Sequence, residues 1–264
     1  MIEDGRTDRI SESLRIINEG KKHGVILRMI GGLAVRAQCE DLEFCEREYG
    51  DIDLVALGKE ITQIRETFAL LGYVEDISVA LSTDRTRLLF RRSDSQNHVD
   101  IFLDKLRMEH TIDLRERLQI EELTISVSDI LLTKLIVYVT NEKDYRDIFT
   151  IIKDKDFGEE DRPGMIDVNY LAETCAKDWG LFQDISAKID ECLRIMKYYS
   201  ISEIEAERIR SRFQKIRERM ESSPKSLKWK LRGLIGKRIA WREIVQEEHL
   251  SVTDLSTEIS KPEG

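Results

Sequence analysis

The sequence predicts an α+β fold in which strands and helices mix in the first part of the chain and only helices follow. Four short apolar runs typical of strands lie at residues 25–30, 51–56, 86–91 and 99–103. A charged segment at 154–164 ends in Pro163-Gly164, and beyond it apolar residues recur at helical spacing. We therefore expect a first domain over residues 1–153, a C-terminal helical domain over 165–250 and a flexible tail over 251–264.

The first domain is expected to alternate helices with these strands. Ile61, Ile64 and Phe68 recur at helical spacing, and Gly72 is typical of the end of such a helix. The polar pair Thr83-Asp84 is typical of a hairpin turn. The expected helices are 11–18, 33–45 and 60–71, and the further expected strands are 77–81, 108–114 and 123–127.

The remaining chain carries recognisable helix starts. Ser128 precedes an apolar-periodic segment and is expected to cap it, as is Asp167 further on. Ser202 and Glu205 have the spacing of a capping box, in which each side chain bonds the other's backbone N–H. The expected helices are 129–139, 142–152, 167–177, 185–196, 202–220 and 225–247.

Three aspartates stand in or beside the apolar runs. Asp51 and Asp53 are two residues apart at the start of a strand, so their side chains are expected to project from the same face. Asp100 lies within a later run, 99–103. Carboxylates held close together repel each other unless a cation lies between them, and Mg²⁺ binds through a few carboxylates together with substrate phosphates.

The pair Gly31-Gly32 directly follows the first apolar run and precedes a helical segment. Without Cβ atoms the backbone can come close to a ligand, and the N–H groups at a helix start attract phosphate. The glycines and the three aspartates together therefore predict a site for Mg²⁺ and a nucleoside triphosphate (NTP).

The order Gly31-Gly32, Asp51-Ile52-Asp53 and Val99-Asp100-Ile101-Phe102 resembles the DNA polymerase β-type nucleotidyltransferase superfamily. More narrowly, residues 25–155 resemble the minimal nucleotidyltransferases that include the abortive-infection, AbiEii-like toxins. The resemblance implies a small mixed sheet flanked by helices, with two Mg²⁺ ions, or Mn²⁺, held by the carboxylates. It also implies transfer of a nucleoside monophosphate from an NTP to an acceptor hydroxyl, with release of pyrophosphate.

The resemblance also implies a role for each matching residue. Asp51 and Asp53 would bind both metal ions, and Asp100 would bind the catalytic ion and take the acceptor's proton. Residues expected to hold the triphosphate are Gly31, Gly32 and Lys134, and residues expected to close the cleft are Lys143, Asp144 and Asp147. Arg36, one turn into the helix after the glycines, is either a further phosphate contact or a surface charge. One departure from the family is the long segment 33–50 with its acidic insert at 40–43, which leaves the loop geometry open.

Composition limits the partners. The 51 acidic and 42 basic residues give a net charge of −9, so the overall basic footprint of a nucleic-acid-binding protein is missing. The expected last helix, 225–247, is nevertheless basic in its first half and contains Trp229 and Trp241. It is either a patch for an RNA acceptor or a bundle helix with a cationic solvent face. The four cysteines lack metal-binding spacing, and no apolar run is long enough to cross a bilayer, so we expect reduced thiols in a cytoplasmic protein.

The acceptor stays open at this stage, between the end of a tRNA or other RNA, a protein hydroxyl and a small molecule. A toxin would imply a cognate antitoxin as partner. Two alternatives come from other classes of protein. One is a relative that binds nucleotide without catalysis. The other is a glycosyltransferase, because an Asp-x-Asp motif can also hold a nucleotide sugar through a divalent ion.

Overall fold

A computed structural model describes residues 9–47, 49–92 and 98–242. Its central sheet has five strands in the order β1-β2-β5-β4-β3. Strands β2 and β5 run parallel, and every other pair of neighbours in the sheet is antiparallel. The strands are β1 Arg28–Met29, β2 Ile52–Ala56, β3 Tyr73–Glu75, β4 Arg87–Arg92 and β5 His98–Leu103. This mixed sheet among helices confirms the α+β class.

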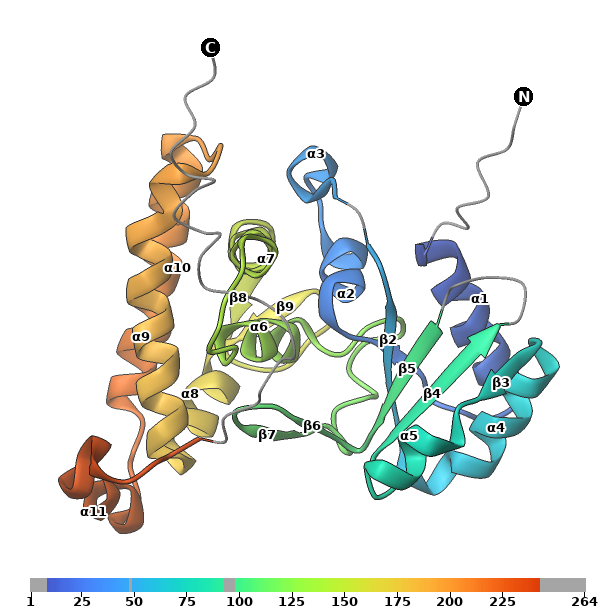
Figure 1. The fold of residues 1–264 in the computed structure, drawn as a ribbon. Coiled ribbons are helices and arrows are strands. Elements are labelled where there is room, and N and C mark those ends of the chain that lie inside the picture. The colour runs from blue at the N-terminus through green and yellow to red at the C-terminus, as the bar shows by residue number, and fades with distance from the viewer. Residues whose placement is uncertain (1–8, 48, 93–97, 243–264) are drawn as a thin grey trace.

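One face of the sheet forms the hydrophobic core. Ile52 and Leu54 of β2 are fully buried, and in register with them lie Val99 and Ile101 of β5. Phe68 of helix α4 (Ile61–Leu70) stacks on Phe90 of β4, with 4.2 Å between ring centroids. Helix α1 (Arg9–Lys22) packs beside α4 (Figure 1). Because side chains alternate along a strand, Asp53 and Asp100 belong to the opposite face.

That opposite face is turned towards a group of three helices. Helix α2 (Gly31–Gln38) contacts β2 and also packs on α6 (Val127–Leu135) and α7 (Glu142–Asp154), so it lies between the sheet and these two helices (Figure 1). The cap of α6 is Ser126, whose hydroxyl accepts from the Asp129 N–H at 3.1 Å. The prediction of Ser128 as the cap is wrong, because that buried hydroxyl instead accepts from the Asp167 N–H at 2.8 Å.

The C-terminal part is helical, as expected. Asp167 caps its first helix and Ser202 forms the expected capping box with Glu205. Arg212 of α10 donates to the carbonyls of Ile152 and Lys153 at the end of α7. The buried apolar residues from Ile16 to Met220 form one continuous cluster. The helices are α8 Val168–Lys177, α9 Trp179–Ile195, α10 Glu203–Ser222 and α11 Leu227–Ile235.

Several boundaries differ from expectation. Residues 77–81 form helix α5 (Ile77–Ser82) instead of a strand, because Asp76 caps the turn by accepting from the Ser78 N–H. The expected linker 154–164 contains β8 (Asp156–Gly158), which pairs in parallel with β9 (Met165–Asp167). Residues 108–114 contribute to the hairpin of β6 (Lys105–Arg107) and β7 (Thr111–Asp113), and 123–127 provide one bridge, Met29 to Thr124.

The expected helix 33–45 divides into α2 and α3 (Leu42–Cys45), and its two cysteines form a disulfide, Cys39–Cys45. The prediction of reduced thiols is wrong for this pair. The turn between the two short helices brings the Cα atoms within 6.7 Å, which a six-residue spacing did not suggest. Cys175 and Cys192 are free and buried. The expected cytoplasmic location was based partly on reduced cysteines, and the disulfide removes that support.

The expected last helix is shorter, since α11 ends at Ile235 and is followed by a 3₁₀ turn, Gly236–Arg238. The end of that expected helix after residue 242 and the expected tail 251–264 lie outside the described residues. Among the helices that the structure describes, none combines the length and the hydrophobicity that a membrane crossing requires.

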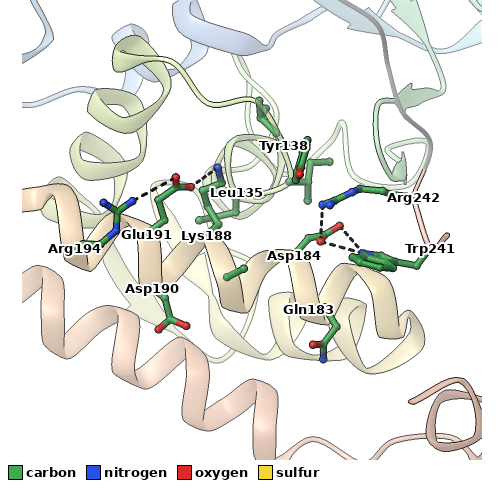
Figure 2. Close-up of a pocket in the computed structure, with 13 residues that line it drawn as sticks. Leu135, Tyr138, Gln183, Asp184, Lys188, Asp190, Glu191, Arg194, Trp241 and Arg242 are labelled. Atoms are coloured by element: carbon green, nitrogen blue, oxygen red, sulfur yellow. Dashed lines mark hydrogen bonds and ion pairs between the residues drawn. The ribbon is translucent and has the colours of Figure 1, made fainter. Parts of the chain in front are cut away.

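A buried histidine joins the β6–β7 hairpin to the C-terminal helices. His110 Nε2 lies 2.8 Å from Asp184 Oδ2 on α9, and its Nδ1 lies 3.8 Å from Asp178 Oδ2. Asp184 also accepts hydrogen bonds from Trp241 and Arg242 (Figure 2). Burial alone would lower the pKa of His110, but the two carboxylates outweigh burial and raise this pKa to about 9.

The fold should therefore lose stability as His110 loses its proton. The histidine pKa is about 6.5 in an unfolded chain. The His110 contribution is thus fully present below pH 6.5 and is lost as pH rises through about 9. Urea unfolding across this range should show a loss of roughly 2–4 kcal/mol in wild type that is absent in His110→Gln. His23→Gln, at an exposed site after α1, should keep the wild-type pH profile. An unchanged profile in His110→Gln would contradict the prediction.

Candidate active site

The parallel pairing of β2 with β5 places Asp53 directly opposite Asp100. Residues opposite each other in neighbouring strands point to the same face, so the two carboxylates lie side by side. Asp51 immediately precedes β2 and is exposed, whereas Asp100 is buried. The structure therefore brings together the three aspartates that the sequence singled out.

The charges of these carboxylates are incompletely compensated. Burial is the main cause that raises the pKa of Asp53 to about 6, and the neighbouring Asp100 and Asp51 carboxylates raise it further. No hydrogen bond or ion pair joins the Asp53 carboxylate to another residue that the structure describes. Asp53 is half-buried, and a half-buried carboxylate without a partner is costly, so this position favours a proton or a cation.

Two basic residues that the sequence analysis did not single out reach the other two carboxylates. Arg87 of β4 donates to both oxygens of Asp100, from Nε at 2.6 Å and from Nη2 at 2.8 Å. His98, the first residue of β5, has its Nε2 3.3 Å from Asp51 Oδ1. Each is the first residue of its strand, on the face that carries the aspartates, and a basic residue at the start of an apolar run was the signal that the sequence offered.

The two glycines lie against this cluster. Helix α2 begins at Gly31, which has a φ of +65°, a conformation that residues with a Cβ rarely adopt. A Cβ at Gly31 would stand 3.2 Å from Asp53 Oδ2. A Cβ at Gly32 would stand 2.6 Å from Arg47 Nη2, so the end of the Arg47 side chain would have to shift. The glycine pair is thus in contact with the acidic cluster on one side and with Arg47 on the other.

Arg47 belongs to a second cluster with Lys134. Lys134 Nζ lies 2.8 Å from Asp144 Oδ1 and 2.8 Å from Asp147 Oδ2, and Arg47 Nη2 donates to both Asp147 oxygens at 2.7 and 2.8 Å. Burial opposes the charge of Lys134, but Asp147 and Asp144 outweigh burial and raise the pKa of Lys134. Lys134 is therefore a positively charged group fixed in place by two carboxylates.

Arg47 was missed because its segment, 46–51, lacks a recognisable motif. Its guanidinium stacks on the Tyr49 ring at 4.8 Å from the centroid. Within the described part of the chain, Arg47 Nε is the one buried side-chain nitrogen or oxygen that has no hydrogen-bond partner. Buried N–H donors nearly always have a partner, so this Nε is a donor whose bonding capacity is unused, whereas the guanidinium nitrogen next to Gly32 is Nη2.

Two of the residues expected from the resemblance lie apart from these clusters. Arg36 is in the last turn of α2, at the opposite end from the glycines. Lys143 is exposed in the first turn of α7. Neither side chain forms a hydrogen bond or ion pair with any residue in the described ranges. Asp144 and Asp147, by contrast, hold Lys134.

A cavity of about 670 Å³ lies elsewhere, between the end of α6 and α9 (Figure 2). None of the residues expected at the nucleotide site lines it. Its charged groups bind one another, since Asp184 accepts from Arg242 and Glu191 pairs with Lys188. The pair of Asp184 with Arg242 joins α9 to the segment after α11, whereas Lys188 and Glu191 both lie on α9.

The carboxylate cluster fits a hard divalent cation by its chemistry, because such ions prefer oxygen ligands. Asp51 and Asp53 supply carboxylates without a guanidinium partner, and the half-buried, unpaired Asp53 carboxylate opposite Asp100 is the observation that favours a cation. In this structure, however, no group of three potential ligands among the described residues is arranged to hold a metal ion. Both oxygens of Asp100 are bound to Arg87.

No model of a known protein family matches the sequence, and no curated protein matches it. A solution structure of the antibiotic-resistance factor ANT(2'')-Ia aligns with 54% of this chain and 82% of its own, at 13% identity and a TM-score of 0.37. A likeness this weak carries no argument about fold or function. The case for a function therefore depends on the geometry of the site.

The Lys134 cluster should be strongly coupled. Replacing Lys134 with Met leaves Asp144 without its cation and should lower the free energy of unfolding by about 3 kcal/mol. Asp144→Asn in the same chain should recover part of this loss, because it removes the uncompensated charge. Urea unfolding of the two single variants and the double variant measures the coupling. Additive losses would contradict the arrangement of charges seen here.

Proposed function

We propose that the chain is a Mg²⁺-dependent nucleotidyltransferase, which moves a nucleoside monophosphate from an NTP to an acceptor hydroxyl and releases pyrophosphate. The observation that carries the proposal is the position of Gly31 and Gly32. Gly31 lies against the Asp53 carboxylate and Gly32 against the Arg47 guanidinium. A triphosphate at the start of α2 would thus have carboxylates for its cation on one side and a fixed positive charge on the other.

The chain's own groups would bind the nucleotide as follows. The N–H groups of the first turn of α2, beginning at Gly31, would donate to phosphate oxygens. Arg47 and Lys134 would neutralise phosphate charge, and Asp147, which contacts both cations, would hold them in position. The proposal also includes Arg36, which would contact the nucleotide once it is bound. It includes Lys143, which would form its contact once the cleft closes.

Asp51 and Asp53 would hold the metal, with Asp100 next to them, and Mn²⁺ would suit the same oxygen ligands. The bound ion would supply positive charge to the phosphates and make the acceptor hydroxyl more acidic. Asp100 would accept the acceptor's proton. Alignment and charge neutralisation suffice for this reaction, so no nucleophilic side chain is proposed.

The resemblance extends the proposal to an AbiEii-like toxin with a cognate antitoxin as partner. The acceptor is one of three classes, an RNA such as tRNA, a protein or a small molecule. The transfer experiment below distinguishes these classes because it resolves the labelled product by size.

Wild-type protein with Mg²⁺ and each α-³²P-NTP should label one class of molecule in a total cell extract. Asp51→Asn and Asp53→Asn should lower this transfer at least about 100-fold, because each removes a carboxylate that the cation needs. Asp113→Asn, which changes an exposed carboxylate of the β6–β7 hairpin, should keep full transfer. Label that survives both site substitutions would refute the metal site, and no label with any NTP or extract would count against catalysis.

The close approach at Gly31 provides a second test. Gly31→Ala and Gly24→Ala both place a Cβ on a residue with positive φ, +65° and +72°, so each should cost roughly 1–2 kcal/mol of stability. Only Gly31 faces Asp53, since nothing lies within 4 Å of a Cβ at Gly24. Gly31→Ala should therefore lower transfer by about 10-fold or more. Equal transfer by the two variants at equal folded fraction would contradict the proposed position of the nucleotide.

A further inference from the structure

The ion pair between Arg87 and Asp100 is the best-formed contact in the acidic cluster. Arg87 lies opposite Phe102 in the β4–β5 pairing, so its side chain shares the face of Asp100 and reaches back along β5. Both arms of the fork donate to Asp100, at 2.6 and 2.8 Å, and the guanidinium rests over the Phe102 ring at 5.4 Å from its centroid. Two-point pairs of this kind are both strong and geometrically specific.

The burial of Asp100 makes this contact hard to share. The Asp100 side chain is 5% exposed, whereas that of Arg87 is 42% exposed. A cation approaching Asp100 would meet a fixed guanidinium that already holds both of its oxygens. It would have to displace Arg87 or remain beside a like charge in a partly desolvated place, and both are unfavourable.

The other carboxylates of the cluster are less firmly occupied. Asp51 has His98 Nε2 at 3.3 Å, which carries a charge only when protonated, and its side chain is 58% exposed. Asp53 has no hydrogen bond or ion pair with any described residue. The negative charge that is free to bind a cation is therefore concentrated at Asp51 and Asp53.

We infer that Arg87 takes the place of one of the two metal ions, so that the site binds a single divalent cation at Asp51 and Asp53. This inference builds on the proposed function, because it assumes that these carboxylates bind a metal. Arg87 then acts as a fixed counterion, which holds both oxygens of Asp100 and excludes a second ion. It is a positioning residue and sets how many ions the site holds.

The experiment counts bound Mn²⁺ by equilibrium dialysis of the full chain at saturating Mn²⁺, with an NTP analogue whose α–β bridging oxygen is replaced by a methylene group. Dialysis leaves the free complex of Mn²⁺ with the analogue at equal concentration on both sides, so the excess on the protein side is bound metal. Wild type should hold one ion per chain. Arg87→Gln should hold two, and Arg87→Lys, which keeps the charge, should hold one.

Arg65→Gln is the matched control and should hold one ion. Arg65 makes a similar fork to Glu75, at 2.8 and 2.9 Å, and its side chain is 43% exposed, but it lies on α4 outside the cluster. Two ions in wild type would overturn the role of Arg87 and leave the proposed function standing, and this outcome does not depend on whether any variant folds. One ion in a folded Arg87→Gln would also overturn it. No ion in wild type would overturn the inference together with the metal part of the proposed function.

Discussion

The parallel pairing of β2 with β5 is the constraint on which the site depends. In this register Asp53 and Asp100 stand opposite each other, on the face of the sheet that is turned away from the α4 core. Two carboxylates in this position repel each other and lose hydration, which is unfavourable unless positive charge is supplied. The surrounding structure supplies part of it, through Arg87 at Asp100. Asp53 is left without such a partner, so a cation bound beside Asp53 would be stabilised.

The glycine pair connects the acidic cluster around Asp53 to the other half of the site, around Arg47. Because β1 is short and α2 begins at once, the backbone must turn sharply at Gly31, and the absence of a Cβ allows it to lie against Asp53. The next residue, Gly32, meets Arg47 on the far side. Arg47 in turn is held by Asp147, which also binds Lys134. One dipeptide thus separates a cluster with excess negative charge from a cluster in which two cations and two carboxylates are balanced.

The sequence could predict the parts of this arrangement that depend on local pattern. The runs around Asp53 and Asp100 were correctly predicted as strands, although β2 begins one residue after Asp51. The α+β class and the caps at Asp167 and Ser202 followed in the same way. Local pattern failed at residues 77–81, where alternating apolar residues suggested a strand but Asp76 caps a helix. It also could not reveal contacts between distant residues, such as Arg87 with Asp100 or Arg47 with Asp147, which lie 13 and 100 positions apart.

These long-range pairs determine which charged groups of the site remain free to bind a ligand. A triphosphate brings negative charge that needs a cation, and the acidic cluster can bind one only where its carboxylates are not already paired. Arg87 fixes Asp100, so the free capacity lies at Asp51 and Asp53, next to Gly31. On the other side, Gly32 lies against Nη2 of the Arg47 guanidinium. An anion at the start of α2 would therefore find the N–H groups of the helix and this positive charge close together.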